Sequence, residues 1–300
     1  MSHVPSITES SRRILRETVG GRSVAIVLAG KSLSEFERRI AAFAGAPLCY
    51  FGLNSFHVHE ECLLKEIGRE FELLLVTWPT EFQRQVDRIA DYLERDSSNL
   101  FITIKANVAR LRTDAPAQHR RLAEQRPKVL FLEDLVPADA FRIRHHVNSA
   151  TVMLASLIFS GCAGPVYILG MDAKTEPGYY RQEQLESYRP LTQDFTTDVF
   201  CFTQNWQVLT RIMQDRGLTR FPPILNCNMD SGVDLFPKIS YDFFYYLVGG
   251  TPALSCETYT ALAKLDPIGP AGRDGRFPTE DTLEITLKRL NDALPETEPW

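Results

Sequence analysis

Continuous apolar runs alternate with amphipathic helical patterns along most of the chain. The first run, residues 24–28, has the unbroken apolar character of a strand that is buried on both faces. A helix is predicted directly after it, because Ser34 and Glu37 match a capping box and apolar residues follow at helical spacing. Further strands are predicted over 47–52, 72–77, 101–104, 129–132, 166–169 and 223–227, and helices over 59–67, 79–95, 150–161 and 199–216. This alternation is typical of an α/β protein with a parallel sheet.

The fold prediction is a Rossmann-like α/β domain with a mostly parallel sheet of about six or seven strands. Residues 1–239 form this nucleotide-binding domain, which begins with a helix whose Arg12, Arg13 and Arg16 are interpreted as a solvated face. Residues 240–300 are predicted to be a C-terminal helical extension. The polar, tyrosine-rich stretch 173–195 has no clear period and is interpreted as a lid, a binding loop or a disordered segment.

Composition narrows the classes of partner. The 300-residue chain has a net charge of −5 and a pI near 5.8, which argues against nucleic acid as the main partner. The basic segment 110–126 is interpreted as a solvated face, with phosphate binding as the alternative.

The cysteines and the apolar runs indicate a cellular location. The six cysteines form no C-x-x-C pair, and several lie inside apolar runs, so we expect small buried hydrophobes in a reducing cytosol. The start of the chain lacks an apolar signal core, and no apolar run is long enough to span a membrane. We therefore predict a cytoplasmic protein without a membrane span.

Candidate binding residues follow the predicted strands. Gly30, Lys31 and Ser32 follow the first strand. Nucleotides bind at the carboxyl ends of parallel strands, where exposed amides and helix dipoles meet phosphate. The first turn contains one glycine and matches neither G-x-G-x-x-G nor a P-loop, so an ordinary βα turn without a ligand stays an alternative.

A second group of candidates precedes the predicted helix over 150–161. Asn148 and Ser149 lie at its start, and Arg144, His145 and His146 precede it, where cations could reach a pyrophosphate on the same helix end. The alternative for these cations is a solvated turn.

Asp172 follows the strand 166–169 and has three interpretations: a magnesium ligand, a partner of a ribose hydroxyl, or a cap for a turn. His57 and His59 are a weaker metal candidate, because such a pair needs further ligands that the sequence does not specify. The identity of any metal is left open.

Four segments together resemble a known group of proteins. VAIVLAGKSL, FGLNSF, NSATVMLASLIFSGCAGPVYILGMD and PILNCNMDSGV occur in this order over about residues 23–235. They resemble the Rossmann-like proteins grouped with archaeal 6-hydroxymethylpterin diphosphokinases, flagellin-modifying motility accessory factors and, more distantly, bacterial CMP-sialic-acid sialyltransferases. The resemblance implies a nucleotide cleft with matching residues at Gly30, Ser32, Asn54, Ser149, Asp172 and Tyr180.

Three positions depart from the sialyltransferase pattern. Lys31 replaces a proline, and Trp78 precedes Pro79 where those enzymes have Asn-Pro. Gln193 lies where their general-base histidine is expected, and a glutamine cannot take a proton at neutral pH. Sialyl transfer is therefore not carried over with the nucleotide cleft.

The leading functional prediction is a transferase acting on a nucleotide-activated substrate. It is glycosyltransferase-like, serves bacterial surface or flagellar glycans, and uses a CMP- or UDP-linked sugar. Gly30, Lys31, Ser32, Asn54, Asn148 and Ser149 would bind the nucleotide, Arg144 and His145 the phosphates, and Tyr180, Asp172 and His146 would be catalytic. The alternatives are a diphosphokinase-like enzyme using ATP and magnesium, and a non-catalytic nucleotide-binding or scaffold protein. Homo-oligomerisation is left open.

Overall fold

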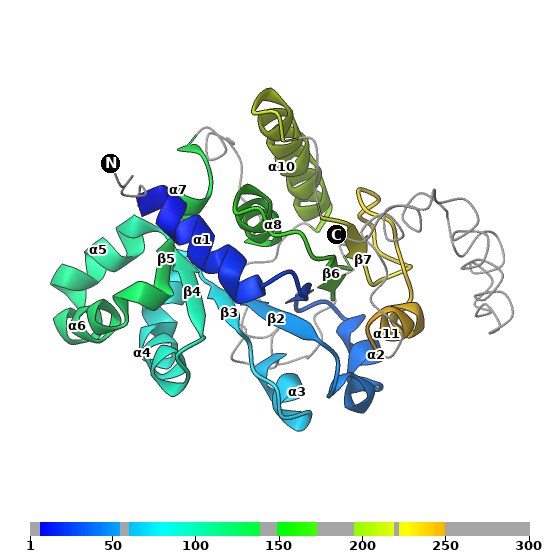
Figure 1. Ribbon diagram of the computed structural model, residues 1–300, viewed down its shortest axis with the longest axis horizontal. Coiled ribbons are helices and arrows are strands. Elements are labelled where there is room, and N and C mark those ends of the chain that lie inside the picture. Colours follow the sequence, from blue (N-terminus) through cyan, green and yellow to red (C-terminus); the bar gives the residue numbers. More distant parts are fainter. Residues whose placement is uncertain (1–6, 55–59, 139–148, 173–194, 219–221, 250–300) are drawn as a thin grey trace, which may run out of the picture.

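The computed structural model describes residues 7–54, 60–138, 149–172, 195–218 and 222–249. They contain a seven-stranded sheet in which all neighbouring strands are parallel, in the order β5-β4-β3-β2-β1-β6-β7 (Figure 1). The strands are β1 Ser23–Val27, β2 Leu48–Leu53, β3 Leu73–Leu75, β4 Leu100–Thr103, β5 Val129–Phe131, β6 Val166–Leu169 and β7 Ile224–Asn226. The predicted α/β fold is confirmed.

Helices cover both faces of the sheet (Figure 1). One face packs against α1 Ile7–Val19, α7 Leu132–Leu135, α8 Ser149–Phe159 and α10 Phe195–Asp215. The other packs against α2 Leu33–Glu37, η1 Ile40–Phe43, α3 Glu60–Glu66, α4 Pro79–Arg95, α5 Lys105–Asp114, α6 Pro116–Glu124 and α11 Tyr241–Gly249. A further short 3-10 helix, η2 Arg126–Lys128, precedes β5. None of the described helices is both long and apolar enough to cross a membrane.

The two covered faces explain the unbroken apolar runs of the strands. In β1, Val24 and Ile26 pack toward α8, whereas Ala25 and Val27 pack toward α2. Since successive side chains of a strand point to opposite faces, every position must be apolar when both faces are buried.

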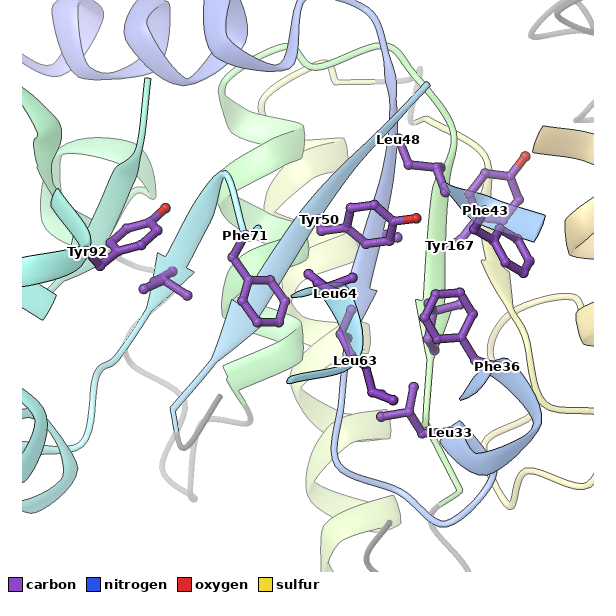
Figure 2. Close-up of a cluster of buried hydrophobic side chains, with 14 of the residues drawn as sticks. Leu33, Phe36, Phe43, Leu48, Tyr50, Leu63, Leu64, Phe71, Tyr92 and Tyr167 are labelled. Atoms are coloured by element: carbon purple, nitrogen blue, oxygen red, sulfur yellow. The ribbon is translucent and has the colours of Figure 1, made fainter. Parts of the chain in front are cut away.

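Aromatic side chains join α11 to the core on the α2 side. Figure 2 shows Phe36, Phe43 and Tyr167 within this apolar cluster, and the Phe36 and Phe43 ring centroids are 4.9 Å apart. Phe244 of α11 stacks on Phe43 with a centroid separation of 5.0 Å and contacts Tyr167 at 4.6 Å. The proposed boundary after residue 239 thus precedes a helix that packs into the domain core, and residues 250–300 lie outside the described part.

One prediction for α1 is wrong in part. Arg13 and Arg16 are exposed, but Arg12 is half-buried. Its Nε donates a hydrogen bond to the Leu135 carbonyl at 2.9 Å, and its guanidinium lies 5.9 Å from the Phe159 ring centroid. Arg12 therefore helps to attach α1 to α7 and α8, because its position on α1 faces these two helices.

The strand order reverses beside β1. From β1 the chain proceeds outward to β5, and it then returns to the other side of β1 to form β6 and β7. The turn after β1 leads to α2 on one face, whereas α10, which follows β6, lies on the other face. Such a switch in strand order is where open α/β sheets bind ligands.

Candidate site at the strand-order switch

The turns after β1 and β6 are in direct backbone contact. The Gly30 N–H donates to the Gly170 carbonyl at 3.0 Å, and Leu28 N–H donates to Leu169 at 2.9 Å. A Cβ atom at Gly30 would lie 2.1 Å from the Gly170 oxygen and 2.8 Å from Cγ of Asp172. Gly170 itself has a φ of +73°. Glycine is needed at both positions because the two turns approach closely.

Asp172 joins three turns at this point. The Ser32 N–H donates to Oδ2 of Asp172 at 3.0 Å, and the Ser32 hydroxyl donates to Oδ1. The side-chain amide of Asn228, which follows β7, donates to Oδ1 at 2.8 Å. Of the three interpretations of Asp172, these contacts are those of a residue that fixes turns. This half-buried carboxylate thus accepts a hydrogen bond from the amide of Ser32, a residue predicted to bind the nucleotide.

The side chain of Tyr241 supports the same turns. Its side chain is buried, its hydroxyl accepts a hydrogen bond from the Gly170 N–H at 3.0 Å, and it also shares a hydrogen bond with Ser32. Burial raises the pKa of the Tyr241 phenol well above its ordinary value, so the hydroxyl stays protonated. The β1 turn is thus held by residues from β6, from the exit of β7 and from α11.

A second polar pair lies on the β2 side of β1. The Asn54 side-chain amide donates to the Ser149 hydroxyl at 2.8 Å, and the Asn54 N–H donates to the Leu75 carbonyl at 2.8 Å. Asn54 adopts a φ of +48°, a left-handed conformation that asparagine tolerates better than most residues. This pair connects the end of β2 to the first residue of α8.

The structure therefore brings together four predicted residues in two pairs, Ser32 with Asp172 and Asn54 with Ser149. The pairs flank β1, since β2 and β6 are its two neighbours. Gly30 and Lys31 precede Ser32 in the turn after β1, and the Lys31 side chain is exposed. Arg144, His145, His146, Asn148, Tyr180, Gln193, His57 and His59 lie outside the described residues.

Two site residues escaped the sequence analysis. Asn228 follows a predicted strand, so the rule that selected Asp172 could have selected it as well. Tyr241 is distant in sequence and gives no local signal. Within the described residues, no group of three or more histidine, cysteine or acidic side chains could hold a metal ion.

The fold and these contacts define a class of protein: a doubly wound α/β domain with polar side chains gathered at its strand-order switch. The chain was also compared with protein-family models, curated proteins and solved structures, and none of the three comparisons gave a match.

Proposed function

We propose that this chain is a transferase that acts on a nucleotide-activated substrate. The donor is a CMP- or UDP-linked sugar, and the reaction is glycosyltransferase-like and serves bacterial surface or flagellar glycans. One observation carries the proposal: polar residues after β1, β6 and β7 bond to one another where the strand order reverses, and Asn54 after the adjacent β2 bonds to the start of α8. The resemblance to nucleotide-binding Rossmann-like proteins supplies the substrate class.

Each described residue has a physical role in this proposal. The exposed ammonium of Lys31 attracts the phosphates of the donor. The Asn54 and Ser149 side chains offer hydrogen-bonding atoms at the next strand end. Asp172 holds the β1 turn in place through Ser32, so its role is positioning, while Tyr180 and His146 keep the catalytic roles that the sequence analysis assigned to them.

A non-catalytic nucleotide-binding or scaffold protein is the second candidate function. The Ser32 N–H already donates a hydrogen bond to the Asp172 carboxylate, so it does not need a phosphate as its acceptor. The same contacts take up lone pairs that a magnesium ion would use, which makes a magnesium- and ATP-dependent diphosphokinase the less favoured enzyme.

Thermal shift with CMP, UDP, GDP and ATP, each with and without magnesium, tests the proposal. A nucleotide present at about one hundred times its Kd should raise the Tm by about 5–10 °C. We expect CMP or UDP to give this shift without magnesium. A shift with ATP that requires magnesium would support the diphosphokinase instead, and no shift with any nucleotide would exclude both enzymes.

Two lysine variants provide the matched comparison. K31A should weaken binding without lowering the Tm of the free protein, because the Lys31 side chain is exposed at the site. K65A removes a similarly exposed lysine from the last turn of α3, where it pairs with Glu61, and should leave binding unchanged. Equal effects of K31A and K65A would place the nucleotide elsewhere. Hydrolysis of the bound nucleotide-sugar then separates an enzyme from a scaffold.

A further inference from the structure

Trp78 presents a large apolar side chain at the carboxyl end of β3. Its side chain is 40% exposed, and the residue follows Val76 and Thr77 at the end of the strand and precedes the first residue of α4. Two other large apolar residues in the described part are as exposed, Val208 and Tyr245, but they lie within α10 and α11. Trp78 is therefore exposed at the edge of the sheet where the candidate site lies.

Two buried polar side chains hold the backbone that leads to Trp78. The Thr103 hydroxyl donates to the Val76 carbonyl at 2.8 Å, and the Asn107 side-chain amide donates to the Thr77 carbonyl at 3.0 Å. The Asn107 amide also contacts the Thr103 hydroxyl at 3.2 Å. Both side chains are buried, and burying a polar group costs free energy unless the group is hydrogen-bonded. Their hydrogen bonds fix the two carbonyls directly before Trp78.

Pro79 and the first turn of α4 fix the backbone at Trp78 itself. A proline disfavours the helical conformation in the residue before it, and Trp78 has an extended backbone with φ −72° and ψ 124°. The Trp78 carbonyl accepts a hydrogen bond from the Phe82 N–H at 2.9 Å. Because the backbone is held on both sides, a ligand that covers the indole does not have to order the backbone.

The position of Trp78 relative to the two polar pairs indicates which part of a bound nucleotide would reach it. Asn54 is hydrogen-bonded to Leu75 of β3, so the ends of β2 and β3 are adjacent. Lys31 and Ser32 follow β1, two strands away from β3, which corresponds to about 10 Å across the sheet. A nucleotide whose phosphates lie near Lys31 can reach β3 with its base.

We propose that the indole of Trp78 stacks on the nucleobase of the nucleotide, an inference that rests on the proposed function. Stacking on an aromatic ring is available to every base, so Trp78 supplies affinity for the base, and other residues select among bases. The phosphates are then held near β1 and the base near β3, and the ribose lies at the Asn54–Ser149 pair between them.

Tryptophan fluorescence provides the direct test. The chain has three tryptophans, so the W206F/W300F variant keeps Trp78 as its only tryptophan. We expect the nucleotide with the largest thermal shift, and also its nucleoside, to quench this emission along a binding curve. Ribose 5-phosphate should not quench it, because it has no base.

Affinity measurements complete the test. W78A should weaken nucleotide binding on the order of 10- to 100-fold, and W78F less, since phenylalanine keeps a ring for stacking. Y245A removes an aromatic side chain that is equally exposed but lies on α11, and its affinity should equal that of the wild type.

Each contrary result has a distinct meaning. A nucleotide that stabilises the protein without quenching Trp78, and binds W78A as tightly as the wild type, overturns the stacking inference and leaves the proposed function in place. Quenching by ribose 5-phosphate assigns Trp78 to the sugar and also overturns it. No response of the wild-type protein to any nucleotide overturns both.

Discussion

Gly30 occupies a position where the space between β1 and β6 allows no side chain. Any Cβ atom there would lie 2.1 Å from the Gly170 carbonyl oxygen, which accepts a hydrogen bond from the Gly30 N–H, and 2.8 Å from Cγ of Asp172. The close approach of the two turns therefore explains why residue 30 is a glycine, with no ligand required.

We predict that G30A lowers the free energy of unfolding by about 2–3 kcal/mol, because one turn must move away from the other. Urea unfolding measures this change. G45A is the matched control, since a Cβ atom at Gly45 meets nothing within 4 Å and should change stability by less than about 0.5 kcal/mol. Equal stability of the two variants would show that the β1 and β6 turns are not in contact.

At this scale the sequence predicted positions better than partners. The rule that ligand-binding residues follow parallel strands selected Ser32 and Asp172, whereas Asn54 came from the resemblance to the Rossmann-like group. That Asp172 bonds to Ser32 and Asn228 depends on strand order, since β1, β6 and β7 become neighbours only after the chain crosses back over the sheet. Local patterns carry no information about that crossing.

Among the elements, those with strong local signals were predicted most closely. The predicted helix over 79–95 is α4 with the same bounds, because Pro79 fixes its start and its apolar positions recur at helical spacing. The predicted strand over 166–169 is β6. The predicted strand over 72–77 extends past both ends of β3, Leu73–Leu75, although Glu72 and Val76 still form backbone hydrogen bonds to the neighbouring strands.

Helix α11 was predicted as part of an extension, yet its inward side is core. Phe244 is fully buried and contacts the rings of Phe43 and Tyr167. We predict that F244A lowers the free energy of unfolding by about 3–5 kcal/mol, the usual cost of removing a buried aromatic ring. Chemical denaturation followed by circular dichroism measures it.

The neighbouring residue serves as the control for this helix. Tyr245 is 40% exposed and forms a T-shaped ring pair with Phe43, so Y245A should cost about 1 kcal/mol or less. If F244A were no more destabilising than Y245A, α11 would not pack on the sheet as described, and the domain would end before residue 240.

On the scale of the whole molecule, ionisable groups are buried throughout the core. Cys49, Cys162 and Cys227 are buried free thiols, as expected from their apolar surroundings, whereas Cys62 is exposed. Burial raises the pKa of Cys49 and of Cys162 to about 12 from an ordinary value of 9.0. The folded protein therefore keeps these thiols protonated in a range of pH where the unfolded chain ionises.

This difference predicts a loss of stability in alkali. A raised pKa in the folded state contributes stability that is complete below pH 9 and is lost as the pH rises to about 12, by roughly 1.4 kcal/mol per pH unit for each thiol. Urea unfolding at pH 8, 9, 10 and 11 measures the slope. C162A should make it shallower by one thiol, and C62A, which removes an exposed thiol, is the control. Equal slopes for C162A and C62A would mean that Cys162 is accessible to solvent. The cluster of buried apolar side chains around Cys162, between α8 and β6, would then be packed more loosely than described.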